Sequence, residues 1–336
     1  MAESGNHIAI NNIGSWHWAS GLDELDYRLV LELKKNPRVS NTKLASLTGI
    51  SETAVRRRID RLVNSGRVIL TAIPNLGVFG YPLMAMLELK VEIARVYEVA
   101  ECLCAYPNIT WVTICTGNSD IFARGFFRSN EDLSKFVAME LGKIAGIIQT
   151  ETMIQLQQLK GVATKSEDDP LRGKHQSTKI PQPVFDKIDY SLILELQNNA
   201  RVSSRRLAKV IGTSSCTIGR RIKRLVDSGG IVLTSIPISG RLDLPARCVI
   251  GLETDLAHLD AIASKLTSYP QVHAVFLVSG TIQILFTVYD SSIERLATFF
   301  RYELSQINGV TRVTTWMQLD ILKSSHSWLQ PELLPM

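Results

Sequence analysis

The sequence lacks several features that would define its class. No apolar run approaches the roughly 18 residues that a membrane-spanning helix needs. The first twenty residues have no basic start followed by an apolar core, so they do not resemble a secretory signal. Five cysteines occur at irregular spacing, and the C-x-C of Cys102 and Cys104 has no second Cys or His pair at zinc-ligand distance. We therefore expect a cytoplasmic protein with reduced thiols, no metal site, no cofactor and no membrane segment.

Neither sign of charge dominates the chain as a whole. Its 336 residues include 37 Lys and Arg and 32 Asp and Glu, for a net charge of +5. The positive charge is concentrated in two places. Residues 22–74 hold ten basic and six acidic residues, and residues 185–237 hold nine and four. These two segments more than account for the net charge, which indicates two local basic surfaces.

The chain contains one unit twice. The stretch SETAVRRRIDRLVNSGRVIL at 51–70 recurs as SSCTIGRRIKRLVDSGGIVL at 214–233, an offset of 163 residues. The same offset places Tyr106-Pro107 on Tyr269-Pro270 and Gly117 on Gly280. A single gapless offset favours duplication of one unit of about 140 residues over a short-period solenoid.

Each unit changes its periodicity partway. Residues 22–36 have helical spacing, Ser40 fits an N-cap for a second helix that stops at Gly49, and a third helix follows Ser51 and runs to about residue 64. RVILTAI then alternates as a strand, so the module is winged or strand-extended. Residues 81–159 read β-α-β-β-α-β, the ferredoxin-like order.

The predicted fold class is therefore α+β, with two copies of a helix-turn-helix (winged) domain followed by a ferredoxin-like βαββαβ domain. The predicted boundaries are a polar N-terminal arm at 1–21, helix-turn-helix domain 1 at 22–74, ferredoxin-like domain 1 at 75–163, a linker at 164–184, helix-turn-helix domain 2 at 185–237, ferredoxin-like domain 2 at 238–326, and a tail at 327–336.

The third helix of each helix-turn-helix domain has an apolar and a basic face. Val55, Ile59, Leu62 and Val63 form the predicted buried stripe. Arginine suits the opposite face because its planar fork binds two acceptors of guanine or grips a phosphate. The predicted DNA contacts are Ser51, Thr53, Arg56, Arg57 and Arg61 in the first copy and Ser214, Thr217, Arg220, Arg221 and Arg224 in the second.

The alternative is that this charged face is merely solvated. We favour DNA binding because the face belongs to the element that reads a groove in helix-turn-helix proteins. Acidic residues are also scarce on it, so we expect little internal ion pairing. The copies differ where Gly219 replaces Arg56 and Gly230 replaces Arg67, so they need not recognise the same half-site.

These motifs resemble the leucine-responsive and asparagine-linked (Lrp/AsnC) regulator family, twice over. The carriers are L-D-x-x-D at 22–26, RVSNTKLASLTGISETAVRRRIDRLVNSGRV, and the T-G-N-S-D turn at 116–120. The resemblance implies a transcriptional regulator that binds double-stranded DNA and forms homo-oligomers, as family members look like dimers or octamers of dimers. The duplication would supply in one chain what a homodimer supplies with two.

The resemblance also implies an effector, an amino acid or a similar small molecule. The positions it points to are Thr116, Gly117, Asp120, Thr150 and Thr152. A carboxylate such as Asp120 can pair an amino group, while hydroxyls and turn amides hold a carboxylate. The simpler reading is that Asp120 stabilises its own hairpin turn. The second copy has Gln283 and Val313 where the first has Asp120 and Thr150. Its pocket is then either vestigial or takes a different ligand, and we favour the vestigial pocket.

Two other functions remain open. Tandem siroheme decarboxylases resemble this fold family, and such an enzyme would use His258, His273 and Arg124 on the ferredoxin-like domains. Lone histidines at such places are usually structural, so we predict that the chain is not an enzyme. A low-specificity architectural DNA binder is the third possibility, since phosphate contacts give affinity without specificity.

Overall fold

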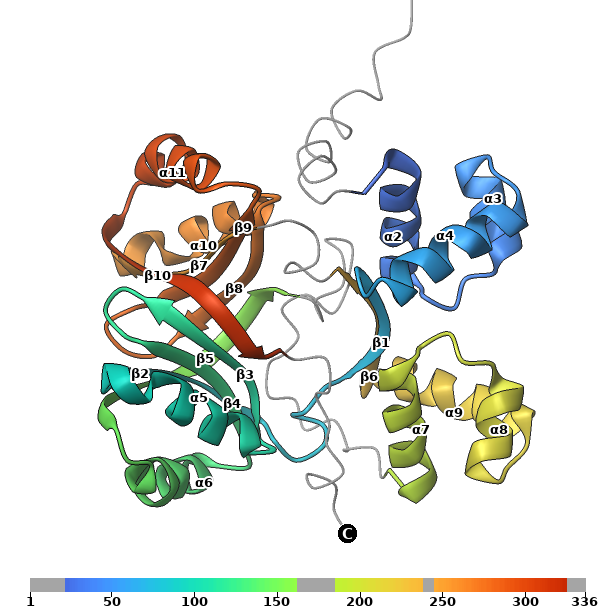
Figure 1. Cartoon of the computed structure of the whole chain (residues 1–336), viewed down its shortest axis with the longest axis horizontal. Helices are drawn as coiled ribbons and strands as arrows, with labels where there is room; N and C mark the ends of the chain where they lie inside the picture. Colours follow the sequence, from blue (N-terminus) through green and yellow to red (C-terminus); the bar gives the residue numbers. More distant parts are fainter. Residues whose placement is uncertain (1–21, 162–184, 238–244, 325–336) are drawn as a thin grey trace, which may run out of the picture. The chain divides into compact units, whose positions relative to one another are not determined.

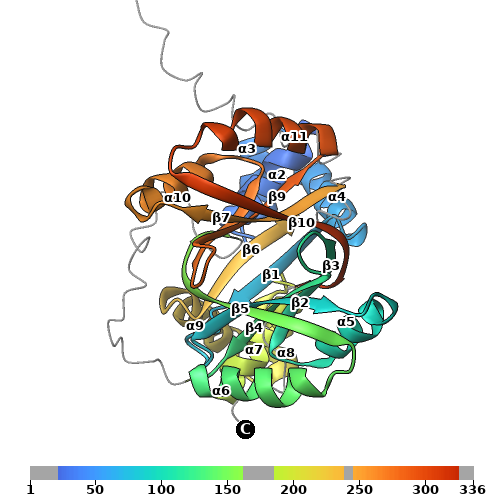
Figure 2. The ribbon, with the colours of Figure 1, turned by 90° about the vertical axis from the view of Figure 1, so that its left-hand side faces the viewer.

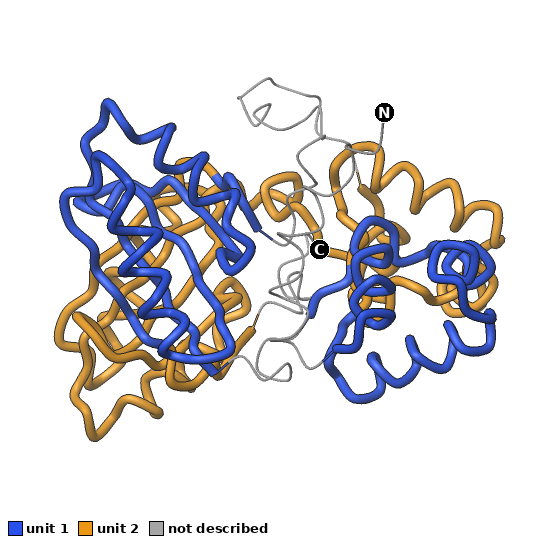
Figure 3. Tube along the Cα trace, turned by 90° about the horizontal axis from the view of Figure 1, so that it is seen from above, with its two compact units in different colours: residues 1–69, 158–164, 235–317 blue, residues 70–157, 165–234, 318–336 orange. Residues whose placement is uncertain are grey.

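The computed structural model describes residues 22–161, 185–237 and 245–324. The predicted arm at 1–21, linker at 164–184 and tail at 327–336 lie outside the described residues. Two compact units interleave along the sequence (Figure 3). Unit 1 takes its described residues from 1–69, 158–164 and 235–317, and unit 2 from 70–157, 165–234 and 318–336. Each unit therefore combines the helix-turn-helix helices of one copy with most of the ferredoxin-like domain of the other. None of the helices in the described part is both long enough and apolar enough to cross a membrane.

The helix-turn-helix domains fold as the sequence predicts. The first comprises α2 (Glu24–Lys35), α3 (Asn41–Thr48) and α4 (Glu52–Asn64), and the second α7 (Lys187–Asn198), α8 (Ser204–Ile211) and α9 (Ser215–Asp227) (Figure 1). Ser40 caps α3 by accepting a hydrogen bond from the Lys43 N–H, and Gly49 ends that helix in the left-handed region with φ of 75°. This is the conformation for which glycine is favoured.

The apolar stripe of α4 is narrower than predicted. Val55, Ile59 and Leu62 are buried, but Val63 is 37% exposed, so its inclusion in the stripe was wrong. At 100° per residue Val63 lies about 80° around the helix from Val55, which places it at the edge of the buried face.

A strand extends each helix-turn-helix domain. These strands, β1 (Val68–Pro74) and β6 (Ile231–Pro237), pair in a two-stranded sheet, so the strand-extended alternative is the observed one. In unit 2 the Thr71 hydroxyl donates to the Gln197 carbonyl oxygen at 2.8 Å. In unit 1 the Ser235 hydroxyl donates to the Val30 carbonyl oxygen at 3.0 Å. Each strand is thus hydrogen-bonded to the first helix of the other copy.

The predicted β-α-β-β-α-β order is confirmed in both copies. The first ferredoxin-like domain comprises β2 (Leu83–Val91), α5 (Val96–Ala105), β3 (Ile109–Thr116), β4 (Ile121–Phe127), α6 (Asn130–Lys135) and β5 (Ile147–Lys160). The second comprises β7 (Ala246–Thr254), α10 (Leu259–Ser268), β8 (Val272–Val278), β9 (Ile284–Asp290), α11 (Ile293–Tyr302) and β10 (Val310–Lys323).

The antiparallel pairings repeat between the copies. In unit 2 β2 lies between β4 and β5, and β3 pairs with β4. In unit 1 β7 lies between β9 and β10, and β8 pairs with β9. Two helices cover one face of each sheet, α5 and α6 in unit 2 and α10 and α11 in unit 1 (Figure 2). The predicted second helix of the first domain is shorter than expected: after α6 the chain continues as a π-type turn and a 3-10 turn.

The long last strand of each copy ends in the unit that holds the other ferredoxin-like domain. There the Lys160 ammonium donates to the carbonyl oxygens of Thr267 and Tyr269, at 2.9 and 2.8 Å. Lys323, its equivalent, donates to those of Cys104 and Tyr106, both at 2.9 Å. A cation at a helix C-terminus satisfies unpaired carbonyls and complements the helix dipole. Lys160 of the first copy therefore caps α10 of the second, and Lys323 of the second copy caps α5 of the first.

Candidate nucleic-acid interface

The third helices α4 and α9 present the predicted contact residues. Ser51 and Ser214 cap them, because each hydroxyl accepts a hydrogen bond from the N–H three residues later, at 3.2 and 3.1 Å. Thr53 is exposed, while the Thr217 hydroxyl is hydrogen-bonded to Ser214. The two serines therefore define where the helices begin, and their side chains have a structural role there.

Buried aspartates pair with arginines of both helices. Asp26, which is 3% exposed, accepts from Arg58 Nη1 at 2.8 Å and from Arg61 Nη2 at 2.5 Å. The half-exposed Asp23 also accepts from Arg58, at 2.5 Å. The hydrogen bonds that Arg58 donates to Asp23 and Asp26 raise the pKa of its guanidinium group. We call this set of contacts the Asp-Arg clamp.

The second copy repeats the clamp. Asp189 has no exposed surface, and its carboxylate accepts from Arg221 Nη1 at 2.9 Å and from Arg224. Arg221 also donates to Asp186 at 2.8 Å. Asp189 additionally accepts from the Asp186 N–H, which completes a capping box at the start of α7. The Asp-Arg clamp therefore ties the first helix of each domain to the third.

We expected little ion pairing on the basic face of the third helix, and this expectation was wrong: the Asp-Arg clamp pairs several of its arginines. The carboxylates come from α2, from α7 and from the residues just before them, and inspection of the third helix alone does not reveal them. Arg61, Arg221 and Arg224, all predicted DNA contacts, are engaged in the clamp. Arg58, the equivalent of Arg221, has the same role and was not among the predicted contacts. The aspartates of the L-D-x-x-D motif were the available signal.

Three of the predicted arginines remain outside the clamp. Arg56 lies 3.7 Å from Asp60 of the same helix, an exposed i,i+4 ion pair. Arg57 and Arg220 occupy equivalent positions, are exposed, and form no ion pair with any of the described residues. Their guanidinium groups are therefore available to an external acceptor.

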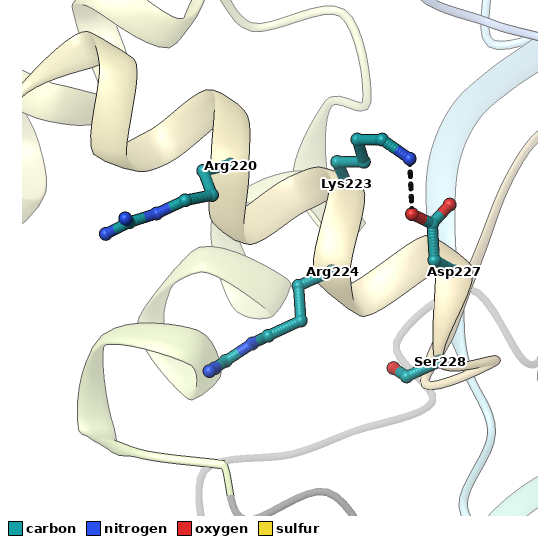
Figure 4. Close-up of a pocket in the computed structure, with 5 residues that line it drawn as sticks. All are labelled: Arg220, Lys223, Arg224, Asp227 and Ser228. Atoms are coloured by element: carbon teal, nitrogen blue, oxygen red, sulfur yellow. Dashed lines mark hydrogen bonds and ion pairs between the residues drawn. The ribbon is translucent and has the colours of Figure 1, made fainter.

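An open hollow lined mainly by basic side chains lies beside the C-terminal half of α9. It has a volume of about 560 Å³ and is lined by Arg220, Lys223, Arg224, Asp227 and Ser228. Arg220 and Arg224 point to one side of the helix, and Lys223 points to the other, where it forms a 2.5 Å ion pair with Asp227 (Figure 4). Nothing lies within 4 Å of a Cβ placed on Gly219, so this side of α9 is open to close approach. Three basic side chains and one acidic side chain line this open surface.

Two of the predicted effector positions, Asp120 and Thr150, both neighbour Leu89 near the end of β2. The Asp120 N–H donates to the Leu89 carbonyl oxygen at 3.0 Å, and an Asp120 carboxylate oxygen accepts from the Val91 N–H at 2.9 Å. Thr150 pairs with Leu89 across β5 and β2, and Thr152 pairs with Leu87. Gly117, with φ of 131°, forms the turn that follows the exposed Thr116. Asp120 therefore has a structural role, as the simpler reading expected, although its partner lies on β2.

Gln283 keeps this contact in the second copy. Its carbonyl oxygen accepts from the Thr254 N–H at 2.8 Å, and its amide nitrogen donates to the Thr281 carbonyl oxygen at 2.7 Å. Thr254 is the equivalent of Val91. The exchange of Asp120 for Gln283 therefore preserves the hydrogen bond to the strand and removes only the charge.

The histidines considered for an enzyme have separate surroundings. His258 bonds to Asp255 at 3.1 Å and packs against Gly309. The His273 ring lies 4.4 Å from that of Tyr289, and burial, with the charges of Lys160 and Lys34, lowers the pKa of His273 to about 3. Arg124 donates to the Thr110 hydroxyl at 3.3 Å. Within the described ranges no group of three or more metal-binding side chains comes together.

Comparisons with known proteins match both copies. An AsnC-type helix-turn-helix domain matches residues 22–63 and 185–226, and an Lrp/AsnC ligand binding domain matches residues 84–162 and 247–328. The chain is 34% identical to the HTH-type transcriptional regulator FL11 of Pyrococcus furiosus, over 40% of this chain and 89% of FL11. It is 33% identical to LrpA of Pyrococcus horikoshii, over 41% of this chain and 99% of LrpA. Each relative thus spans about one of the two copies.

A solved structure resembles nearly the whole chain. It is the siroheme decarboxylase NirDL in complex with an iron-uroporphyrin III analogue, with a TM-score of 0.63, 13% identity, and coverage of 90% of this chain and 97% of NirDL. At this identity the likeness shows a shared fold and says nothing of shared chemistry. The four matched domains and the regulator relatives give the assignment: this chain belongs to the Lrp/AsnC family and is a DNA-binding transcriptional regulator with both of its domains duplicated.

Proposed function

We propose that the chain is a sequence-specific regulator that reads two half-sites with the two third helices of one polypeptide. Arg57 and Arg220 are the proposed base-reading residues, because they are exposed, equivalent and free of ion pairs among the described residues. The Asp-Arg clamp holds each third helix on the first helix of its domain. Arg61 and Arg224, partly neutralised by their aspartates, and Lys223 are proposed phosphate contacts. Thr53 and Arg56 remain proposed contacts of the first copy.

The differences between the third helices support two different half-sites. Arg56 and Asp60 in α4 are replaced by Gly219 and Lys223 in α9. The number of positive side chains stays the same, one negative side chain is lost, and the backbone is open at Gly219, so the net charge of these positions rises by one. We therefore expect an asymmetric operator, unlike the palindrome that a symmetric dimer favours.

The test is recovery of fragmented host genomic DNA on the purified chain, followed by sequencing. A few sharp, asymmetric sites are expected. Broad recovery with a steep salt dependence would instead support the low-specificity architectural binder. Failure to recover DNA, together with tetrapyrrole absorbance in the purified protein, would favour the enzyme.

We also propose that the first ferredoxin-like domain binds an amino acid or similar effector at the turn of Thr116, Gly117 and Asp120, with Thr150 and Thr152. Asp120 and Thr150 both neighbour Leu89 at the end of β2. One Asp120 carboxylate oxygen is engaged by Val91, and the carboxylate charge is available to an ammonium group.

Asp120→Asn separates the structural role of this residue from its binding role. Asparagine keeps an acceptor for the Val91 N–H, as Gln283 does for Thr254, so the melting temperature of the free protein should change little. Among the standard L-amino acids, the one that stabilises the parent protein most should bind the variant with about tenfold or more lower affinity. Thermal melting across that panel measures both effects. An unchanged ligand response would remove Asp120 from the site, and Gln283→Glu tests whether charge restores binding in the second copy.

Assembly into homo-oligomers is supported by apolar side chains that are exposed at equivalent positions of both copies. Ile93 and Leu256 are 80% and 72% exposed, and Leu156 and Leu319 are 67% and 59% exposed. Met139 and Tyr302 form a third such pair. We infer that these equivalent positions contribute to contacts with a further copy of the chain.

His273 gives a pH prediction that bears on the enzyme alternative. A group with a pKa of about 3 stays neutral near pH 7 and is a poor proton donor there. Because the folded pKa lies below the unfolded value of about 6.5, this group's contribution to stability is present above pH 6.5 and is lost as the pH falls toward 3. We expect a loss of about 2 kcal/mol in the free energy of unfolding between pH 7 and pH 5.

His273→Thr, the residue that the first copy has as Thr110, should remove this slope. Urea unfolding at pH 7 and pH 5 measures it, and His258→Thr is the control because His258 is half exposed. An unchanged slope in His273→Thr would show that His273 titrates normally, which would reopen a role in proton transfer.

A further inference from the structure

A short segment of the first copy is part of the core of the second helix-turn-helix domain. Residues 75–81 lie between β1 and β2, and three of their side chains, Leu76, Phe79 and Tyr81, are buried. They belong to the same apolar cluster as the buried face of the second domain, which comprises Leu192, Ile193, Leu196, Leu207, Ile218, Ile222 and Leu225. All of these residues lie in unit 2. The segment therefore buries apolar surface of a domain that is more than 100 residues away in the chain.

Phe79 makes the most specific contacts of this segment. Its ring stacks on Phe185 with centroids 4.8 Å apart and lies 5.9 Å from the ring of Tyr190. A Cβ on Gly230 would come within 3.1 Å of the Phe185 ring, so glycine leaves room for the stack. The Asn75 N–H donates to the Gly230 carbonyl oxygen at 2.9 Å. These contacts give a structural reason for Gly230, which stands where the first copy has Arg67.

The other end of the segment is fixed to the first ferredoxin-like domain. The Tyr81 hydroxyl accepts a hydrogen bond from Arg128 at 3.1 Å, and the guanidinium carbon lies 5.3 Å from the Tyr81 ring centroid. Arg128 directly follows β4, and Phe126 of that strand packs against the same apolar cluster. β4 begins beside Asp120, in the proposed effector turn. The contacts therefore run from that domain through residues 75–81 to α7.

The sequence of the second copy does not repeat these residues. Ser239, Leu242 and Leu244 stand where the first copy has Leu76, Phe79 and Tyr81, and Ser291 replaces Arg128. Residues 238–244 lie outside the described residues. The second copy therefore lacks the side chains that make the aromatic and cationic contacts of Phe79 and Arg128 in unit 2.

We propose that residues 75–81 lock the second helix-turn-helix domain onto the first ferredoxin-like domain, which makes Phe79, Tyr81 and Arg128 positioning residues for DNA recognition. The role in DNA recognition rests on the proposed function. A ligand in the ferredoxin-like domain of one copy would then act on the DNA-reading domain of the other. Without such a lock, relative motion of the two domains is the default expectation.

The chain carries natural labelling sites for a test. Cys102 on α5 and Cys216 on α9 are exposed, whereas Cys115 and Cys248 are buried. In the full-length chain with Cys104→Ser, nitroxides on Cys102 and Cys216 report the distance between the two domains by pulsed dipolar EPR, without DNA. We expect one narrow distance distribution, which Phe79→Ala and Arg128→Gln broaden by about twofold or more.

Controls keep the result interpretable. Ser291→Ala, at the position equivalent to Arg128, should leave the distribution unchanged, and Phe79→Leu removes the stack while keeping an apolar side chain. Circular dichroism shows whether each variant is folded. A distribution that is already broad in the parent protein, or that stays narrow in folded Phe79→Ala and Arg128→Gln, would overturn the lock. Because this readout needs no DNA, its failure is distinct from failure of the proposed function, which the genomic DNA recovery tests.

Discussion

Replacing Asp189 with alanine is expected to lower the free energy of unfolding of the second helix-turn-helix domain by about 3 kcal/mol or more. Asp189 is fully buried and accepts hydrogen bonds from Arg221 and Arg224. Arg221 has a side chain only 19% exposed, so the substitution leaves a largely enclosed cation without its main partner. The capping-box contact to the Asp186 N–H is lost as well.

Native-state hydrogen exchange of the α7–α9 amides measures this effect within the full chain. The matched control is Asp227→Ala, which removes an ion pair with both side chains more than half exposed and should change stability by less than about 1 kcal/mol. Asp189→Asn keeps the shape of the side chain and removes its charge. Its loss of stability should lie between those of Asp189→Ala and Asp227→Ala. Equal exchange in Asp189→Ala and Asp227→Ala would show that the Asp-Arg clamp does not stabilise the domain. In that case, the side chains of Arg221 and Arg224 would be available for DNA contacts.

The helix-turn-helix domains were predictable because their signals are local. Serine caps, the glycine stop and the 3.6-residue period all act within one turn or two. The Asp-Arg clamp was not predicted, because Asp26 and Arg58 are 32 residues apart and meet only after the helices pack. Charge on one face of a helix says little about pairing when the counter-charge lies on another helix.

The ferredoxin-like order was also predicted, but the exchange of segments between the copies was not. The two copies have the same pattern of apolar residues. A strand or helix could therefore pack against either copy, and the pattern does not show which one supplies the partner. Lys160 illustrates this: its pattern indicates a strand end, while its partners are carbonyls of α10 in the other copy. Gln283 in place of Asp120 suggests a changed pocket from sequence alone, which does not reveal that its amide preserves the backbone contact that Asp120 makes.

Arg57→Ala and Arg220→Ala should each weaken operator binding by about 1–3 kcal/mol, or roughly 5-fold to 150-fold. Each substitution removes the one exposed arginine of its helix that forms no ion pair with a described residue. Because the two residues lie on different domains, the double variant should lose the sum, about 2–6 kcal/mol. Neither substitution disturbs the Asp-Arg clamp, so the folded stability should stay within about 0.5 kcal/mol of the parent.

Titration of the recovered genomic sites with each variant, at several salt concentrations, measures the loss and its origin. A base contact changes the preference among sequences while leaving the salt slope nearly constant, whereas a phosphate contact weakens all sequences and lowers the slope by about one. Arg56→Ala is the comparison in the first copy: because Arg56 is paired with Asp60 and its position is Gly219 in the second copy, its loss should weaken binding less than Arg57→Ala does. Loss in Arg57→Ala without loss in Arg220→Ala would show that only the first copy reads bases. Uniform weakening in both, with a reduced salt slope, would reassign these arginines to the phosphate backbone and leave specificity to the shape of the DNA.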